Sequence, residues 1–343
     1  MKSKRLFTIL FAGIFVLLVL DISIGSVRIP LREVGKALFG ASDHTEWNTI
    51  VRIFRIPKTL TALLAGMALA VSGLILQSVF KNPLAGPDSL GIGSGASLGV
   101  GFLILATGNT SSALLGGLAT FGYAALVIAA SAGAGLVLAL ILFLSRKFER
   151  GVTLLIVGLL IGYLTGSLVS LLIFFGTPQK VQLYMGWTYG SFSGVRLGEL
   201  PVFSLAILAG LLLTISSSKA LNAFIISDTF ALTLGIQVKQ ERTKLLAAAA
   251  LLAGSVTAFC GPIAFLGIAA PQAARRVFKS SDHAVLLPGT LLAGAVIALL
   301  ADITSQLPGG GTVLPINPLL ALIGAPFILA IFVRGSATRG GEL

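Results

Sequence analysis

Cysteine, histidine and charged side chains are all scarce in this sequence. Its 343 residues include one cysteine, Cys260, and two histidines, and Asp, Glu, Lys and Arg together make up only 10%. A single cysteine excludes an intrachain disulfide, and its apolar surroundings favour a small buried residue. Hydrophobic residues make up 56% of the chain and the mean hydropathy is +1.00, far above the range of soluble domains. The chain is therefore predicted to be an all-α polytopic membrane protein.

Motifs for catalysis are also missing. No G-x-x-x-x-G-K-[ST] phosphate loop is present, so the chain is not expected to hydrolyse ATP by itself. Paired aspartates, Ser-His pairs and His-x-x-x-His spacing are not seen, which argues against an intramembrane protease or a metal site. We therefore expect no enzyme activity, no catalytic or metal-binding residue and no cofactor.

The 12 acidic residues and both histidines are predicted to lie at the ends of apolar segments or in connections. Asp21, Asp88 and Asp302 stand at such ends, and His44 and His283 lie in loops. Carriers driven by protons or sodium usually hold acidic or histidine side chains inside their spans. No buried titrating relay is predicted, which disfavours an ion-driven carrier.

Apolar segments long enough to cross a bilayer occupy most of the chain. A span needs about 20 mostly apolar residues, and about ten such segments leave room for a single transmembrane domain over residues 1–343. The predicted spans are 6–26, 59–80, 90–107, 114–144, 152–175, 200–216, 245–264, a short one at 263–274, 284–303 and 316–333. The N-terminal segment has the basic start and apolar core of a signal peptide but no clear cleavage site, so a retained first span is predicted.

The net charge of +12 is explained by the ends of the spans rather than by nucleic acid. Most of the 24 basic residues face the cytoplasm if both termini lie there, as the positive-inside rule expects. The exception is a basic cluster from Arg28 to Lys58 on the external side. Two explanations stay open: an anionic surface docks there, or a loop of about 30 residues is too long for its charges to affect topology.

Two polar segments are long enough to be more than turns. Gly176–Leu200 is predicted to be external, and its Tyr184, Trp187 and Tyr189 suit an interfacial aromatic belt. Ser216–Lys244 is predicted to be cytoplasmic, with apolar residues at helical spacing among polar ones. It indicates one or two short amphipathic helices that lie on the membrane or against a partner.

The stretch Val79–Gly99 interrupts the apolar run after the second span. Pro83 and Pro87 prevent the helix from continuing, and Asp88 and Ser89 are predicted to cap the next span. Irregular backbone at membrane depth is tolerated where protein or a water-filled cavity shelters it. A turn that faces a central pathway is therefore plausible.

Three glycines follow the interruption at a spacing of four residues: Gly91, Gly95 and Gly99. This spacing places small residues on one helix face and lets another helix approach closely. Close packing of helices is favoured over ligand binding.

Several motifs resemble those of the FecCD/BtuC-type permeases, the membrane subunits of ABC importers for iron-siderophores, haem and cobalamin. Arg52–Gly99, with its NPLA-x-P-x-x-L-G motif, resembles the family signature. Further matches follow in family order along essentially the whole chain: TLGIQV (233–238), GPIAFLGIAAPQAAR (261–275), DHAVLLPG (282–289), LLADI (299–303) and IGAPFILAIFVR (323–334).

The resemblance implies a type II ABC importer permease fold with ten spans. It also implies two permease subunits, identical or homologous, around one pathway in the lipid bilayer. Two cytoplasmic ATPase subunits and an extracytoplasmic substrate-binding protein complete such an assembly. The expected location is the bacterial cell (inner or plasma) membrane.

Basic side chains on the outer face of this family meet acidic residues of the binding protein. The matching positions are Arg55 and Lys58, which gives the external charge a docking role. The alternative is simple interfacial anchoring of the second span. A third family arginine is replaced by Gln306, so docking on that side is expected to be weaker or shared with a different subunit.

The resemblance also places two cytoplasmic sites. The family's ATPase-coupling helices correspond to about 219–240, where Ala231, Leu234 and Gly235 match the pattern and Asp228 stands in place of a glutamate. The cytoplasmic gate corresponds to Asn82, Pro83 and Leu84. The family's P-H-x-x-R motif has Gln272 in place of histidine, so no titrating role is expected there.

These observations predict a permease that moves an iron-siderophore, or a related metal chelate, into the cytoplasm by alternating access. The energy would come from a separate ATPase. The rival interpretation is a stand-alone secondary transporter of a small organic solute, which would need an ion-coupling residue that the sequence does not reveal.

Overall fold

The computed structural model describes residues 2–25, 27, 29–42, 44–106, 121–145, 151–308 and 312–339, and within these ranges the chain is helical without strands. The first half holds α1 (Lys2–Ser23), α2 (Leu31–Leu38), α3 (Thr45–Thr49), the π-helical η1 (Ile50–Arg55), α4 (Ile56–Val79), the 3₁₀ helix η2 (Pro87–Leu90), α5 (Ile92–Gly101), the π-helical η3 (Phe102–Ala106), α7 (Phe121–Ser145) and α8 (Gly151–Phe175). The second half holds α9 (Pro178–Thr188), the 3₁₀ helix η4 (Phe192–Gly194), α10 (Leu200–Ser216), α11 (Ser218–Ile226), α12 (Asp228–Thr233), α13 (Val238–Cys260), α14 (Leu266–Phe278), α15 (His283–Ser305) and α16 (Ile316–Arg339).

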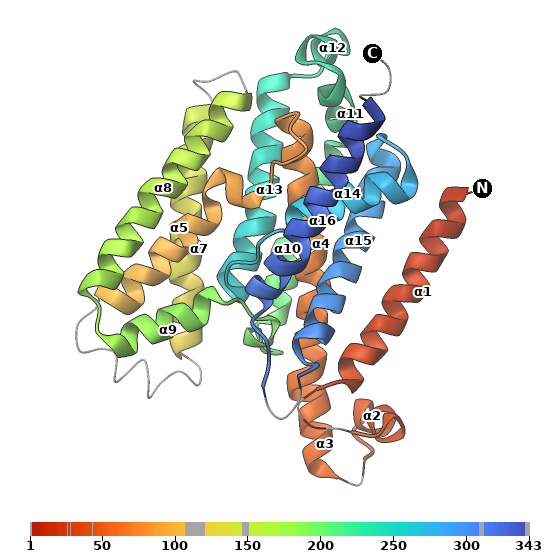
Figure 1. The fold of residues 1–343 in the computed structure, drawn as a ribbon, viewed down its shortest axis with the longest axis vertical. Coiled ribbons are helices and arrows are strands. Elements are labelled where there is room, and N and C mark those ends of the chain that lie inside the picture. The colour runs from red at the N-terminus through yellow and green to blue at the C-terminus, as the bar shows by residue number, and fades with distance from the viewer. Residues whose placement is uncertain are drawn as a thin grey trace.

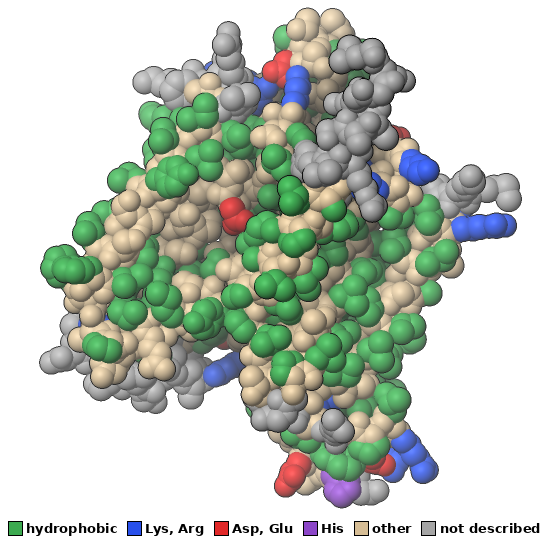
Figure 2. All heavy atoms as spheres, viewed as in Figure 1, with side chains coloured by type: hydrophobic (Ala, Val, Ile, Leu, Met, Phe, Trp, Pro, Cys, Tyr) green, Lys and Arg blue, Asp and Glu red, His purple; other side chains and the backbone are tan. Residues whose placement is uncertain are grey.

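The helices form a bundle with two distinct ends (Figure 1). One end carries α2, α3 and α9, and is called here the α3 end. The other carries α11, α12 and the C-terminal end of α16, and is called the α12 end. Most charged side chains on the visible face lie near these two ends, whereas apolar side chains cover the surface between them (Figure 2). This distribution suits a bundle whose middle lies in hydrocarbon.

Among the residues that the structure describes, six helices are long and apolar enough to cross a membrane, and the pair α10–α11, bent by 57°, makes a seventh candidate. Shorter apolar helices at Ile92–Ala106 and Ile316–Ala330 add to these. With the short α14, the predicted architecture of about ten helices is confirmed. The predicted span at 200–216 coincides with α10, whereas the start of the predicted span at 114–144 falls outside the described residues.

Two segments outside the predicted spans contain helices. The helical path that ends at Val79 begins at Thr45, so much of the basic segment before the second span is helical. In the same way α9 lies inside the predicted 176–200 loop. The apolar runs in both segments are too short to indicate a span, so the sequence did not place a membrane helix in either.

Helix α4 lies at the centre of the bundle, where it packs against α13, α14 and α15. Small residues allow these backbones to approach: a Cβ atom on Gly66 would lie 2.4 Å from the Gly294 carbonyl oxygen, and one on Gly73 would lie 1.6 Å from that of Gly267. The apolar core spreads outward from this contact and includes Cys260, which is buried. Close packing of small residues is a common way to associate helices within a bilayer.

The three regularly spaced glycines contact two different helices. Gly95 and Gly99 face α7, and a Cβ atom on Gly99 would lie 2.0 Å from the Ala129 carbonyl oxygen. Gly91 precedes α5 with φ of +71° and faces α8 at Gly158. The predicted capping of this span is wrong: Asp88 and Ser89 lie in η2, and Gly91 takes the cap position without a side-chain hydrogen bond.

Candidate functional site

A cavity of about 1200 Å³ opens at the α3 end. Its walls come from the segment after α1, from η1 and the start of α4, from most of residues 189–198, and from the end of α15 with residues 313–316. The loop at 189–198 is held in place by the Ser191 amide, which donates to the Cys260 carbonyl at 2.8 Å. The cations among its described lining residues are Arg55, Lys58 and Arg196.

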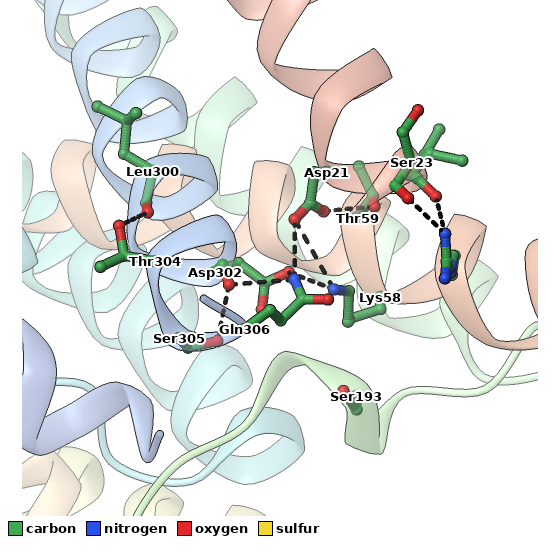
Figure 3. A network of polar contacts seen from close by, with 12 residues as sticks. Asp21, Ser23, Lys58, Thr59, Ser193, Leu300, Asp302, Thr304, Ser305 and Gln306 are labelled. Atoms are coloured by element: carbon green, nitrogen blue, oxygen red, sulfur yellow. Dashed lines mark hydrogen bonds and ion pairs between the residues drawn. The ribbon is translucent and has the colours of Figure 1, made fainter. Parts of the chain in front are cut away.

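Lys58 sits between two carboxylates on neighbouring helices (Figure 3). Its Nζ lies 2.7 Å from Asp302 Oδ2 on α15 and 3.7 Å from Asp21 Oδ1 on α1. The Gln306 amide donates to both carboxylates, at 3.3 Å to Asp21 and 3.2 Å to Asp302, and the Thr59 hydroxyl donates to Asp21. These five side chains form the Lys58 cluster.

The Lys58 cluster is buried, although its members stand near the ends of their helices. Asp21 is 0% exposed, Asp302 4% and Lys58 8%. The sequence predicted no buried titrating relay, and it did not indicate that these three ionisable side chains are buried together. Asp21 and Asp302 are near helix ends as the sequence indicated, but α1, α4 and α15 pack so closely that the ends face one another. Asp21 and Gln306 are 285 residues apart in the sequence, so nothing local indicates that they come together.

Arg55 is held by backbone carbonyls rather than by an acid. Its Nη1 donates to the carbonyls of Ile22 and Ser23, each at 2.8 Å, and its Nη2 donates to that of Val27. The side chain is 6% exposed. Arg55 thus fixes the end of α1 and the chain after it to the start of α4. Gln306, which replaces a third family arginine, is part of the Lys58 cluster.

The turn Lys81–Leu84, called the Asn82 turn, lies at the α12 end of α4. Lys81 has φ of +50°, a left-handed conformation that ends the helix. The Asn82 side chain accepts from the Leu84 amide at 2.9 Å, and Leu84 is 49% exposed. Gln272 of α14 donates to the Pro83 carbonyl at 2.8 Å. The three residues predicted as a gate thus form one ordered turn with an exposed apolar tip.

Gln272 and Arg275 of α14 both contact Gln77, which lies near the end of α4. Arg275 Nη1 and Gln272 Nε2 both donate to Gln77 Oε1, the latter at 3.4 Å. Gln272 thus helps to position the Asn82 turn. The sequence indicated only that glutamine replaces the family histidine, which excluded a titrating role.

Asp228 lies at the start of α12 and connects three elements. Its Oδ2 accepts from Arg242 Nη2 of α13 at 2.7 Å, and its Oδ1 lies 3.6 Å from Lys81 Nζ. These three residues form the Asp228 cluster. The side chains of Lys81 and Asp228 are 42% and 44% exposed, whereas that of Arg242 is only 9% exposed.

The other predicted coupling residues take different places around α12. Ala231 is fully buried, Leu234 is 58% exposed, and Gly235 has φ of +74° with open space where a side chain would be. Ser227 caps α12 by accepting from the Phe230 amide at 2.9 Å. The segment thus combines a buried anchor with an exposed apolar surface that includes Ile226 and Leu232.

A buried chain of hydrogen bonds joins α11, α15 and α4. Asn222 Oδ1 contacts His283 Nδ1 at 2.7 Å, and His283 Nε2 contacts Ser78 Oγ at 2.8 Å. The statement that Ser-His pairs are missing is therefore wrong. Ser78 and His283 are only 2% and 1% exposed, so no substrate can reach them, and the arrangement is structural rather than catalytic.

Asp282, just before α15, completes this chain of hydrogen bonds on its exposed side. The Ala284 amide and the Asn222 side chain both donate to its carboxylate, which lowers its pKa. A lowered pKa means that this stabilisation is present above the unfolded pKa and is lost as the pH falls through the folded pKa. Within the ranges that the structure describes, no group of three potential metal ligands is found.

Comparison with known proteins shows which family the chain belongs to. A model of the FecCD transport family matches residues 13–334. The chain is 32% identical over 328 residues to the hemin transport system permease protein HmuU of Yersinia pestis, which covers 92% of this chain and 96% of the relative. It is 34% identical over 283 residues to the vitamin B12 import system permease protein BtuC of Salmonella paratyphi A, over 82% of this chain and 83% of the relative.

A solved structure shares the fold. It is described as an inward-facing conformation of a metal-chelate type ABC transporter, and it matches with a TM-score of 0.82 and 26% identity over 96% of this chain and 99% of that chain. The fold and these matches define a polytopic helical transport protein of the permease class. The chain belongs to the FecCD transport family, as its motifs predicted.

Proposed function

We propose that this chain is the membrane-spanning permease subunit of an ATP-driven importer that passes a metal chelate into the cytoplasm by alternating access. The observation that carries the proposal is the match of fold over almost the whole chain to a metal-chelate type ABC transporter. The sequence lacks a phosphate loop, so ATP hydrolysis is assigned to a separate ATPase dimer. An iron-siderophore is the leading substrate class, and haem and cobalamin are the alternatives that the named relatives suggest.

In the proposed orientation the α12 end faces the cytoplasm and the α3 end faces outward. Both chain termini then lie in the cytoplasm of a bacterial cell, and the protein crosses the plasma membrane many times. A second permease subunit, identical or homologous, would complete the pathway. The exposed apolar surface of α11 and α12 would then contact the ATPase through the segment that includes Leu234 and Gly235.

The α3-end cavity is proposed to receive the binding protein. Its cations support attraction of an acidic surface, which would steer docking more than it adds affinity. Arg55 and Lys58 stay predicted docking residues, but their internal partners favour a role in fixing the start of α4. Arg196, which is exposed and lines the same cavity, is the cation with the greatest freedom to contact a partner.

The Asn82 turn is proposed to be the cytoplasmic gate, where two symmetry-related copies close the pathway. Its exposed tip at Leu84 and its place beside α12 support this role. Cross-linking of an Asn82→Cys variant between two permease subunits tests it. The expected result is a nucleotide-dependent change in cross-linking, and an unchanged yield in all nucleotide states would count against a gate.

Reconstitution tests the whole function. The purified chain is placed in proteoliposomes with and without its ATPase and binding protein, and uptake of a ferric hydroxamate, haem and cobalamin is measured. We expect uptake of one chelate only when all components and ATP are present. Uptake by the chain alone, driven by an ion gradient, would support a secondary carrier instead.

A further inference from the structure

Two polar connections join the α11–α12 segment to the end of α4 that carries the Asn82 turn. One is the buried chain from Asn222 through His283 to Ser78. The other is the ion pair between Asp228 and Lys81. They arise from different helices, α11 and α12, and they reach α4 and its turn at points three residues apart.

The hydrogens of the buried connection can be assigned from its partners. Asn222 Oδ1 accepts from the His283 backbone amide at 2.8 Å and also contacts Nδ1, so Nδ1 must carry a proton. In the neutral ring Nε2 can then only accept, and its donor is the Ser78 hydroxyl, whose oxygen also lies 2.9 Å from the Leu74 carbonyl oxygen. A shift of α11 that left α4 in place would break the bonds between Asn222 and His283 or take the buried His283 Nε2 away from its donor Ser78, which is costly.

The second connection is more exposed, but it is fixed on one side. Asp228 is anchored by Arg242, whose guanidinium carbon lies 6.0 Å from the centre of the Phe224 ring on α11. The other carboxylate oxygen, Oδ1, contacts Lys81 Nζ. Lys81 has a left-handed backbone conformation and is the first residue of the Asn82 turn. Gln272 holds the far side of the turn from α14. The Asn82 turn is therefore contacted by α12 on one side and by α14 on the other.

We propose that the α11–α12 segment moves the Asn82 turn through these two connections, with Ser78 and Lys81 as positioning residues of the gate. The inference rests on the proposed function, in which an ATPase displaces the α11–α12 segment and the Asn82 turn closes the pathway. It adds the residues through which that displacement reaches the turn.

The test follows the exposure of the turn in the complete complex of permease, ATPase and binding protein in lipid nanodiscs. Cys260 is the only cysteine, so Cys260→Ala provides a background for Leu84→Cys. The labelling rate of this thiol by a water-soluble maleimide is measured without nucleotide and with ATP plus vanadate. ATP hydrolysis and retention of the ATPase by the permease are recorded on the same samples.

The variants Ser78→Ala, Lys81→Met and their combination each have a matched control. Ser72→Ala removes an equally buried α4 hydroxyl, but one that bonds the Ala249 carbonyl of α13 at 2.8 Å. Lys279→Met removes a lysine that also has a left-handed conformation after a helix at the α12 end. Lys279 forms no ion pair with the part of the chain that the structure describes.

We expect the combined variant to lose the nucleotide-dependent change in labelling while it still retains the ATPase and hydrolyses ATP. Both controls should keep the change, and Lys81→Arg should restore what Lys81→Met loses. Labelling of the combined variant that still responds to nucleotide as the controls do would overturn the inference. If instead the parent Leu84→Cys chain shows no response, or fails to retain an ATPase, the proposed function fails rather than the two connections. If the combined variant does not fold, the single variants Ser78→Ala and Lys81→Met are compared with their controls. Each should show a weaker labelling response, and a full response in both would overturn the inference.

Discussion

The two ends of α4 carry ionic clusters of opposite composition. At the α3 end one cation, Lys58, lies between two carboxylates, whereas at the α12 end one carboxylate, Asp228, lies between two cations. The first cluster is almost fully buried, and two of the three side chains in the second are nearly half exposed. A buried charge that loses its partner is very costly, but an exposed pair can separate into water at little cost.

This difference assigns different mechanical roles to the two ends. The Lys58 cluster, together with Arg55, fixes α1, α4 and α15 relative to one another. The Asp228 cluster positions the Asn82 turn but can be rearranged. In the proposed transport cycle, α4 is therefore held at its outer end and adjustable at its inner end.

The largest effect is expected from Lys58→Met. The substitution leaves two buried carboxylates without their cation, which should lower the free energy of unfolding by about 3–5 kcal/mol. Thermal unfolding of the detergent-purified chain measures this. Unchanged stability, with weaker binding of the substrate-binding protein, would instead establish Lys58 as a docking residue.

Asp302→Asn should have a smaller effect at the same end. Lys58 keeps Asp21 as a partner, so only one charged hydrogen bond is lost, and the expected cost is about 1.5–3 kcal/mol. The same unfolding assay measures the loss. A cost equal to that of Lys58→Met would show that Asp21 alone cannot hold the lysine.

Ser227→Ala tests the helix that presents the Asp228 cluster. Loss of the N-cap hydrogen bond should destabilise α12 by about 1 kcal/mol. Hydrogen–deuterium exchange should become faster at 228–233 and remain unchanged at 56–62. Equal acceleration at both places would mean that the two ends of α4 do not behave independently.

The smallest effect on stability is expected from Lys81→Met. The pair with Asp228 is half exposed and 3.6 Å long, so its loss should cost less than about 1 kcal/mol. Unfolding measured beside the Lys279→Met control checks this. A loss as large as that of Lys58→Met would remove the distinction between a fixed and an adjustable end.

Much of the fold could be predicted from the sequence because hydrophobic length and proline positions report directly on spans and their breaks. The stretch around Pro83 and Pro87 was predicted to be an interruption, and the structure shows an ordered turn there. Family motifs located the Asn82 turn and the α12 segment. The end of the span at 216 was also predicted, and the structure adds that α11 follows α10 at a bend of 57°.

The buried polar groups could not be predicted for a related reason. Asp21 and Asp302 look like ordinary span-end acids, and nothing local indicates that both reach Lys58. Ser78 and His283 are 205 residues apart. Burial depends on which helix ends face one another, and a single sequence carries no signal for such pairing.

Backbone hydrogen exchange in the complete complex tests the central claim most directly. Exchange is compared without nucleotide and with ATP plus vanadate. A fixed outer end and an adjustable inner end predict changes at 79–91 and 218–236, with none at 56–62 or 300–305. Changes of equal size around Lys58, with none in the Asn82 turn, would contradict the account.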